Sequence, residues 1–562
     1  MSATPTTDNP DLAIAQAATL EPITAIAERA GIPEDALIPH GRYIAKIDPR
    51  ELPDSTRTGR LVLVSAMSPT PAGEGKSTTT VGLADAFTRM GLRTMVALRE
   101  PALGPIMGIK GGATGGGYSQ VVPMEDINLH FTGDFHAIQI ANNTLAALID
   151  NHLQQGNELD IDPRRIQWRR VVDVNDRALR SVVIGLGGAT EGVVRQDGFD
   201  IVVASEVMAI LCLATDLADL ERRLGDVVIG LSYDREPVTV RDLRVEGAIA
   251  MLLKDAIRPN LVQTLGGTPA LVHGGPFANI AHGCNSLVAT RMALGLADMV
   301  VTEAGFGSDL GAEKFLDIKA RHGGLTPDAA VVVATVRALK MHGGVVKADL
   351  GAEDVEAALR GTENLRRHVT NLRKFGLEPV IALNRFPTDT EAELSAVQDW
   401  ARGEGFRVAL SEVWEHGGAG GEALAEQVLA AIEAGEGEGY HPLYDPEAGI
   451  EESLRTLARE VYGAEDVVFE GQAPAKLRML ARNGWDRLPV CVAKTQYSFS
   501  DDATRLGAPS EHVLHVRDLV PKIGAGFVVA LTGSIMTMPG LPKEPAALRM
   551  GLDEQGNPRG LF

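Results

Sequence analysis

The sequence has few cysteines, few aromatic residues and no long apolar run. Its three cysteines, Cys212, Cys284 and Cys491, lie far apart without metal-ligand spacing, which argues against a disulfide framework and for a reducing compartment. The apolar runs, such as the one beginning at Ile201, are short and interrupted, which argues against a membrane-spanning helix. The first residues show no basic-then-apolar signal typical of secretion. We expect a cytoplasmic protein with no membrane partner.

Positive charge is also scarce. The 562 residues include 53 Lys and Arg against 74 Asp and Glu, a formal net charge of −21. This balance disfavours nonspecific binding to nucleic acid, although a local field in a cleft can still attract anionic substrates. Aromatic residues make up 4% of the chain, so an aromatic side chain in a polar loop is notable. The length predicts roughly two to four domains, because one hydrophobic core rarely extends this far.

Apolar runs typical of strands buried on both faces recur along the chain. They occupy 60–67, 93–100, 181–186, 200–205, 226–232, 297–305, 329–339, 379–386, 488–495 and 526–542. Helical patterns lie between several of them, and the first 60 residues resemble a helical lead-in broken at Pro33 and Pro53. This alternation predicts an α/β fold with a P-loop NTPase-like, mainly parallel sheet and additional α/β domains.

The domain limits are expected as a P-loop α/β region over 1–360 and a C-terminal α/β region over 361–562. An inserted domain is predicted near 150–270. The polar, glycine-laced segment 433–449 is typical of a loop or hinge.

The segment "TPAGEGKST" between the first strand and a helix has the features of a phosphate-binding loop. Its glycines let backbone N–H groups turn toward phosphate oxygens, its lysine adds a cation, and its serine offers a hydroxyl to Mg²⁺. Threonine stands where the pattern G-x-x-x-x-G-K-[ST] has its first glycine. The alternative is a tight strand–helix turn with an exposed lysine. The candidate nucleotide-binding residues are Thr70, Pro71, Ala72, Gly73, Glu74, Gly75, Lys76, Ser77 and Thr78.

The second strand ends in Arg99 and Glu100, at the edge where α/β sheets place ligands. An arginine there can fork onto a carboxylate or a phosphate, whereas the alternative is an ion pair between these two neighbours. The glycine run 111–117 allows close approach of the backbone to a ligand, although it could also form a surface loop.

Beyond these features, the chain resembles the formate–tetrahydrofolate ligase family. The first family signature, G-[LIVM]-K-G-G-A-A-G-G-G-Y, appears as "GIKGGATGGGY" over 108–118, with Thr114 replacing the second alanine. The second appears as "VATVRALKMHGG" over 333–344, and "TPAGEGK", "REP", "EDINLHFTGD" and "TEAGFGSDLGAEKF" also match. The resemblance covers essentially the whole chain, whose length agrees with the monofunctional form, so we expect one activity.

The resemblance implies ATP-dependent ligation of formate to tetrahydrofolate through formyl phosphate, in one-carbon metabolism. It assigns catalysis to Lys76 and Arg99, with Arg99 holding formate and then formyl phosphate, and it places Phe306 in the formate pocket. Mg²⁺ would be held by Ser77 and the ATP phosphates. Glu100 resembles a residue near a monovalent-cation site for K⁺ or NH₄⁺. Glu303 has either a Mg²⁺ or proton role or an ion pair with Lys314 or Lys319.

The resemblance also assigns the folate site. Phe386, with Pro387, and Trp414 would stack on the pterin, and Asp134 would bind its ring nitrogens; without the resemblance, core packing and a helix cap are the alternatives. The folate is expected to be polyglutamylated and the protein a homotetramer. Five histidines stay unassigned, with structural or hydrogen-bonding roles favoured: His130, His136, His282, His322 and His342.

Three other classes share parts of the pattern. Bacterial tyrosine kinases have a similar P-loop but carry a tyrosine-rich tail, and the last tyrosine here is Tyr497. Chromosome-partitioning ATPases are shorter and need a basic face. A GTP-binding switch would need aspartate where "ALNRFP" has Pro387. A nonenzymatic scaffold is disfavoured by the complete phosphate loop, so the ligase remains the preferred hypothesis.

Overall fold

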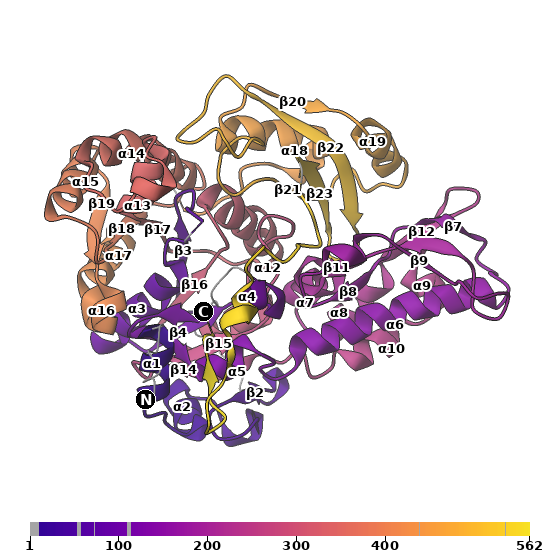
Figure 1. Cartoon of the computed structure of the whole chain (residues 1–562), viewed down its shortest axis with the longest axis horizontal. Helices are drawn as coiled ribbons and strands as arrows, with labels where there is room; N and C mark the ends of the chain where they lie inside the picture. Colours follow the sequence, from indigo (N-terminus) through magenta and orange to yellow (C-terminus); the bar gives the residue numbers. More distant parts are fainter. Residues whose placement is uncertain are drawn as a thin grey trace, which may run out of the picture.

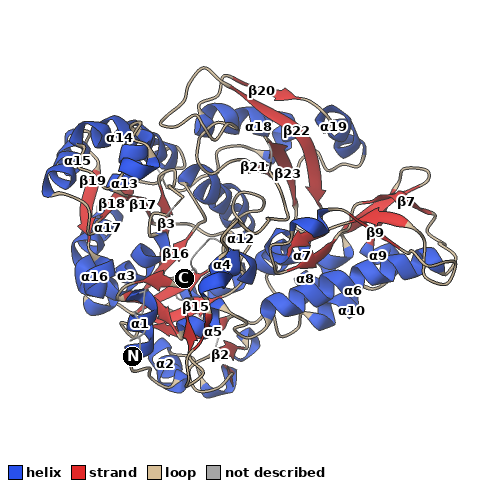
Figure 2. Ribbon diagram, viewed as in Figure 1, coloured by secondary structure: helices blue, strands red, loops and turns tan. Residues whose placement is uncertain are grey.

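The computed structural model describes residues 10–52, 58–71, 73–108, 114–435, 437, 439–533 and 535–561. One large mixed sheet lies at its centre, with helices against both faces (Figure 1, Figure 2). Its strands follow the order β1-β2-β14-β15-β4-β16-β3-β17-β18-β19, and β5 and β6 attach beside β14. The seven strands from β15 to β19 in this order run parallel. The prediction of an α/β fold with a large, mainly parallel sheet is confirmed.

Five of the ten expected apolar runs, at 60–67, 93–100, 297–305, 329–339 and 379–386, form strands of this sheet: β3, β4, β16, β17 and β18. The strands are β1 (Leu37–Pro39), β2 (Ala45–Ile47), β3 (Arg60–Ala66), β4 (Thr94–Leu98), β5 (Gly115–Gly116), β6 (Ser119–Val122), β14 (Asn260–Thr264), β15 (Pro269–Val272), β16 (Met299–Glu303), β17 (Ala329–Ala334), β18 (Pro379–Asn384) and β19 (Arg407–Ser411).

The parallel strands read as continuous apolar runs because both faces of the sheet are covered. On β3, Leu61 and Leu63 face one core. Val62 and Val64 face the other core, which contains residues of helices α3 (Lys76–Arg89) and α17 (Glu422–Ala434). All four side chains are at most 1% exposed. Alternation therefore disappears from the sequence, as expected for a strand buried on both sides.

The helices connect and cover the sheet. They are α1 (Pro10–Ala17), α2 (Ile23–Ala30), α3 (Lys76–Arg89), α4 (Leu103–Gly108), α5 (Met124–Asn128), α6 (Asp134–Gln154), α7 (Glu206–Leu213), α8 (Leu217–Gly225), α9 (Val240–Leu243), α10 (Glu246–Leu252), α11 (Leu287–Leu296), α12 (Arg321–Gly323), α13 (Val336–His342), α14 (Val355–Arg373), α15 (Glu391–Gly403), α16 (Val413–His416), α17 (Glu422–Ala434), α18 (Ile450–Leu457) and α19 (Ala473–Arg482). Two π-helical segments, η5 (Ser308–Ala312) and η6 (Phe315–Ala320), follow β16. Among the described residues, no helix combines the length and apolarity that crossing a bilayer requires.

Several expected strands lie outside the main sheet, in an arm that includes α6 to α10 and projects to one side (Figure 1). Its strands are β7 (Ile161–Ile166), β8 (Arg170–Val172), β9 (Val182–Ile184), β10 (Arg195–Asp197), β11 (Phe199–Ile201), β12 (Val228–Ser232) and β13 (Pro237–Thr239). They pair in sheets of two or three strands. The strand predicted over 200–205 is wrong after Ile201, because 202–204 form a buried 3₁₀ turn. A short apolar run does not distinguish these two structures.

The lead-in is not purely helical. β1 and β2 pair as an antiparallel ribbon, and β2 joins β14 at the sheet edge. The break expected at Pro53 lies outside the described residues. The strands β14 and β15 had no counterpart among the predicted runs. Polar residues interrupt β14 (NLVQT), although all five of its residues are buried.

The C-terminal region contains its own sheet and core. Its strands β20 (Asp466–Phe469), β22 (Val513–Lys522), β23 (Phe527–Thr532) and β21 (Val490–Ala493) pair in that order, and β24 (Gly551–Leu552) pairs with β25 (Pro558–Arg559). Helix α14 runs unbroken through residue 360, and β18 and β19 extend the main sheet beyond it. The domain limits of 1–360, 361–562 and 150–270 therefore stay predictions. After α17 ends at Ala434, the described residues up to Asp445 form neither helix nor strand, as expected for a loop.

Candidate functional site

Three adjacent parallel strands bring the main predicted residues to one edge of the sheet. The strands β4, β16 and β3 are neighbours, and their carboxyl ends lead to Arg99, Glu303 and the phosphate-binding loop. Because parallel strands end on the same side, this edge collects side chains far apart in sequence. The sequence placed Arg99 beside the loop but did not reveal that β16 lies between them.

The loop over residues 70–78 that is predicted to bind phosphate, called the phosphate-binding loop below, requires glycine at two described positions. Gly73 and Gly75 have φ angles of +84° and +71°, in the left-handed region that favours glycine. A Cβ atom on Gly75 would lie 2.5 Å from Nδ2 of Asn384. Gly75 is also the N-cap of α3, so the helix N-terminus begins at Lys76, where its partial positive charge favours an anion. Of the predicted loop residues, Ala72 lies outside the described residues.

Glu74 holds this loop in shape from inside. Its carboxylate is 1% exposed, and it accepts a 2.6 Å hydrogen bond from the Thr70 backbone N–H and another from the Thr335 hydroxyl. Asn384 donates to the Glu74 carbonyl over 3.1 Å. The Glu74 side chain is thus a structural part of the loop, and it faces Thr335 rather than solvent. Thr335 belongs to the second family signature, whose packing against the loop the sequence did not reveal.

Glu303 joins the cationic and hydroxyl groups at the site. Its Oε1 accepts from Arg99 Nη2 over 3.3 Å, and its Oε2 accepts from Ser77 Oγ over 2.8 Å. Burial lowers the pKa of the Lys76 ammonium, the Glu303 carboxylate opposes this shift, and Arg99 adds to it. The Glu74 carboxylate also acts on Lys76, so Lys76 and Arg99 belong to a cluster with two carboxylates, at which an anionic ligand can meet both cations.

This arrangement differs from the two ion pairs considered from the sequence, and the ligand roles of Arg99 and Glu303 stay predictions. Arg99 pairs with Glu303 and not with its neighbour Glu100. Glu303 pairs with Arg99, whereas Lys314 donates to the Ala278 carbonyl and Lys319 to Asn285 and Thr290. The Arg99 side chain is 18% exposed, and its buried Nε has no hydrogen-bond partner within the described residues.

The loop after β16 packs directly against Arg99. A Cβ atom on Gly305 would lie 2.9 Å from Arg99 Nη1 and 2.7 Å from the Ala278 Cβ, so only glycine fits. The next residue, Phe306, has a φ of +59°, which is uncommon for an aromatic residue. Such strain persists where the surrounding structure imposes it, often at a ligand site. Phe306 thus directly follows Gly305, the residue that packs against the Arg99 guanidinium.

The two predicted stacking residues follow neighbouring strands. Phe386 comes after β18 and Trp414 after β19, whose ends pair at Asn384 and Ser411. The guanidinium of Arg337 lies 3.8 Å from the centre of the Phe386 ring, and Asp389 accepts from the Phe386 N–H over 2.8 Å. Phe386 is therefore held in place by groups on α13 and on its own loop. Pro387, the next residue, is exposed.

Trp414 packs on the end of the glycine-rich signature. Its indole N–H donates to Asp11 over 3.1 Å, and its carbonyl accepts from the Tyr118 N–H over 2.8 Å. A Cβ atom on Gly117 would lie 2.0 Å from the Trp414 carbonyl oxygen, so this glycine permits the contact. The signature residues 109–113, including Lys110, lie outside the described residues.

Asp134 lies away from these aromatics, in a buried ion pair. Its carboxylate is bound by Lys46 Nζ at 2.7 Å and by Asn260 Nδ2 at 2.8 Å. Asn260 begins β14, six positions from β18 in the strand order. Asp134 is the first residue of α6, and Gly133 is the N-cap, so Asp134 is not the cap. The structure thus does not bring Asp134 directly beside Phe386.

Glu100 shares this second buried cluster. Burial raises its pKa well above the ordinary range, and the nearby Asp134 carboxylate raises it further, whereas Lys46 lowers it. Its buried Oε2 has no hydrogen-bond partner within the described residues. Arg99 and Glu100 therefore point to different surroundings, although they are adjacent in sequence.

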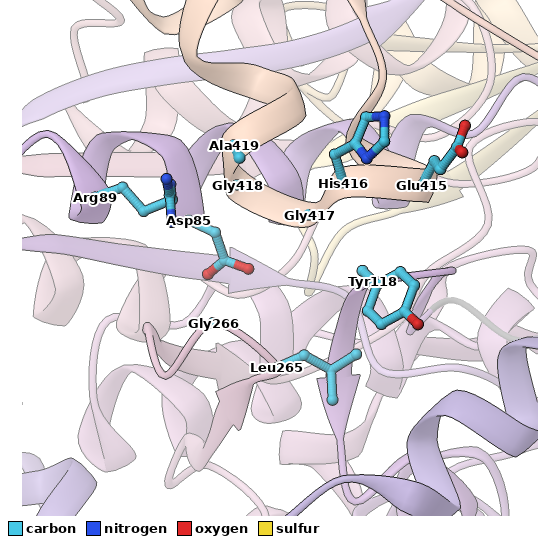
Figure 3. A pocket seen from close by; sticks show the side chains of 10 residues that line it. All are labelled: Asp85, Arg89, Tyr118, Leu265, Gly266, Glu415, His416, Gly417, Gly418 and Ala419. Carbon is cyan, nitrogen blue, oxygen red and sulfur yellow. The ribbon is translucent and has the colours of Figure 1, made fainter.

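A surface cavity of about 340 Å³ lies beside the C-terminal half of α3 (Figure 3). Its lining residues come from α3, the turn between β5 and β6, the turn after β14, and the segment after β19: Asp85, Arg89, Tyr118, Leu265, Gly266, Glu415, His416, Gly417, Gly418 and Ala419. Asp85 is nine residues from Lys76 on α3, about 13 Å along a helix. The cavity is therefore separate from the N-terminal end of α3.

Asp85 makes stability depend on pH. Burial raises its pKa from about 3.8 to about 6, although Thr264 donates a hydrogen bond to it. A carboxyl with a raised folded-state pKa stabilises the fold most at low pH, and that stability is lost as pH rises from about 4 to 6. We expect Asp85→Asn to gain stability relative to wild type across this interval, by up to about 2–3 kcal/mol. Denaturant unfolding at several pH values tests this, and a pH-independent difference would contradict it.

Among the described residues, no three His, Cys, Asp or Glu side chains gather in a metal-binding group. His342 has a hydrogen-bonding role: its Nε2 contacts the Ser68 carbonyl at 3.0 Å. His130 and His136 contact each other at the surface, and the buried His282 has no hydrogen-bond partner for its ring within the described residues.

The sequence did not single out Asn384 or Arg337, although "ALNR" and the second signature contain them.

Comparison with known proteins identifies the relatives of this chain. A family model described as "Formate--tetrahydrofolate ligase" matches residues 9–562. A protein of that name from Arthrobacter sp. (strain FB24) is 64% identical over 559 residues, covering 98% of this chain and 99% of the relative. Its namesake from Staphylococcus carnosus (strain TM300) is 63% identical over 552 residues, with the same coverage. Another from Renibacterium salmoninarum is 62% identical over 557 residues, covering 98% of each chain.

Proposed function

The chain belongs to the formate–tetrahydrofolate ligase family, and we propose that it joins formate to tetrahydrofolate with ATP, giving 10-formyltetrahydrofolate, ADP and phosphate. The observation that carries the site assignment is the meeting of Arg99 and Ser77 on Glu303, beside Lys76. This supports the proposal, because the two cations follow neighbouring parts of the sheet and lie near one carboxylate, and transfer of a phosphoryl group to a carboxylate requires such charge neutralisation.

In the first step, a formate oxygen attacks the γ-phosphorus, the bond to the bridging oxygen of ADP breaks, and formyl phosphate forms. Positioning and charge neutralisation matter most here, because phosphoryl transfer needs little covalent help. Lys76 and the loop N–H groups would hold the phosphates. Arg99 would hold the formate carboxylate with two N–H groups, and the strained Phe306 would close the pocket.

In the second step, the folate N10 attacks the formyl carbon. The bond from this carbon to the phosphate oxygen breaks, phosphate leaves, and the N10 proton passes to the departing phosphate. Arg99 would stabilise the charge that grows on the phosphate, as preorganised donors do at developing anions. This step needs N10 close to Arg99, which requires folate to enter over the same sheet edge.

The folate site is proposed at Phe386, Pro387 and Trp414, which follow the neighbouring strands β18 and β19. Arg337 already covers one face of Phe386, so a pterin would stack on the other. Asp134 remains a proposed contact of the pterin nitrogens, with Lys46 and Asn260 orienting its carboxylate.

Two ions complete the proposal. The Ser77 hydroxyl and Glu303 carboxylate are oxygen donors that suit Mg²⁺ together with the ATP phosphates, and the ion would neutralise phosphate charge there. Glu100, with its unpartnered buried oxygen, suits K⁺ or NH₄⁺. The P-loop NTPase-like fold, cytoplasmic location, homotetramer and polyglutamylated substrate also remain proposals.

The test is formate-dependent turnover. Purified protein with MgATP, formate and tetrahydrofolate is expected to release ADP and to form a product that acid converts to the absorbing methenyl derivative. Omission of formate or of tetrahydrofolate should abolish the methenyl absorbance. Equal ADP release with and without formate would contradict the proposed reaction.

A further inference from the structure

Ser68 lies two positions before the phosphate-binding loop, and its N–H, carbonyl and hydroxyl groups all form hydrogen bonds. Ser68 donates its N–H to Asn364 Oδ1 over 3.2 Å, and its hydroxyl accepts from Asn364 Nδ2 over 3.1 Å. Its carbonyl contacts His342 Nε2 at 3.0 Å, and its hydroxyl contacts His368 Nε2 at 3.0 Å. Asn364 and His368 lie four residues apart on α14, so one helix face presents both.

The other ring nitrogen of His368 reaches the opposite wall of the site. Its Nδ1 contacts the Ser308 hydroxyl at 2.7 Å, and Ser308 lies two residues after Phe306. A Cβ atom on Gly307 would lie 3.0 Å from His368 Cε1, so the chain between Phe306 and Ser308 packs on this ring. One fully buried imidazole therefore bridges the residues flanking the phosphate-binding loop and the Phe306 loop.

One neutral tautomer of this ring satisfies all of these contacts. In it, the Ser68 hydroxyl accepts from Asn364 and donates to His368 Nε2. Nδ1 is then protonated and donates to the Ser308 hydroxyl, which donates in turn to the His368 carbonyl at 3.4 Å. Burial lowers the pKa of His368 well below its ordinary value, so the ring stays neutral. Each end of the bridge has a defined donor and acceptor.

We propose that His368 is a positioning residue that sets the spacing between the nucleotide loop and the Phe306 wall of the formate pocket. The part of this inference that concerns formate, the contact of His368 with Ser308, rests on the proposed function. The part that concerns the nucleotide, the contact with Ser68, requires only that the loop binds a nucleotide. Because the two contacts use different ring nitrogens, each half can be broken separately.

Two substitutions separate the halves. Asparagine places an amide near Nδ1, so His368→Asn keeps the donor to Ser308 and loses the contact with Ser68. Glutamine places its amide oxygen near Nε2, so His368→Gln keeps the acceptor for Ser68 and loses the contact with Ser308. Both lose the packing on Phe499, whose ring centre lies 4.5 Å away, so this loss is common to the pair.

We expect each variant to weaken the binding of a different ligand. His368→Asn should raise the Kd of MgADP about fivefold, as loss of one hydrogen bond predicts, and leave the KM of formate within about twofold. His368→Gln should raise the KM of formate about fivefold, lower the preference for formate over acetate in ADP release, and leave MgADP binding within about twofold. Calorimetric titration with MgADP and steady-state ADP release measure these values.

Parallel changes in both variants, or no change in either, would overturn the proposal. A wild-type protein without formate-dependent turnover would instead refute the proposed function, while the MgADP titrations would still decide the nucleotide half. If a His368 variant fails to fold, Ser68→Ala replaces the asparagine variant and Ser308→Ala replaces the glutamine variant. His512→Asn, a buried histidine of the C-terminal region outside this network, is the matched control and should change neither ligand constant.

Discussion

Replacement of Arg99 by alanine is expected to lower kcat/KM for formate by about 100- to 1,000-fold, the cost of losing one preorganised oxyanion donor. The guanidinium is mostly buried, and its Nε has no partner within the described residues, so this donor is not committed to a protein acceptor. Loss of the guanidinium also removes the ion-pair partner of the buried Glu303 carboxylate. The negative charge of Glu303 would then oppose the binding of an anionic substrate. Steady-state ADP release at varied formate concentration measures the effect.

Two further variants define this result. Arg99→Lys keeps the charge but loses the planar fork, so it should recover only part of the activity. Arg93→Ala removes an exposed arginine just before the same strand, where it pairs with Asp298 at 2.8 Å, and should leave kcat/KM unchanged. If Arg99→Ala retained wild-type kcat/KM for formate, the assignment of Arg99 to formate would be wrong.

Replacement of Lys46 by methionine is expected to reduce the free energy of unfolding by about 3–5 kcal/mol, because it leaves a buried carboxylate without its partner. Lys46 and Asp134 are each only 3% exposed, and their charged atoms are 2.7 Å apart. Lys46 also opposes the raised pKa of the neighbouring Glu100. Denaturant unfolding of variant and wild type measures the loss.

The double variant Lys46→Met with Asp134→Asn separates the pair from its surroundings. Because it removes both charges, it should recover much of the stability lost in the single variant. Lys374→Met is the surface control: its partner Glu460 is 2.9 Å away, but their side chains are 40% and 47% exposed, so the cost should stay below about 1 kcal/mol. An equal loss in the free energy of unfolding for Lys46→Met and Lys374→Met would contradict the expectation that burial makes the loss of an ion-pair partner more destabilising.

The success of the strand predictions varied with the surroundings of each apolar run. The runs that became β3, β16, β17 and β18 form the centre of the sheet, where both faces are covered and every residue from one end to the other tends to be apolar. The run at 181–186 has similar composition, yet β9 lies on a small two-stranded sheet of the arm, where Val183 is 58% exposed. Composition alone does not tell these settings apart.

The sequence by itself determined the family, and it predicted a phosphate-binding loop and site roles for Lys76, Ser77, Arg99 and Phe306. These features depend on residue type and local spacing. Glycines at turns and short connections between a strand and a helix leave patterns that can be recognised in the sequence. Only the tertiary structure decided that Glu303 joins Arg99 to Ser77, that Lys46 neutralises Asp134, and that His368 bridges two loops. Each of these contacts joins residues more than 50 positions apart, so the order of the strands and the packing of α14 had to be known first.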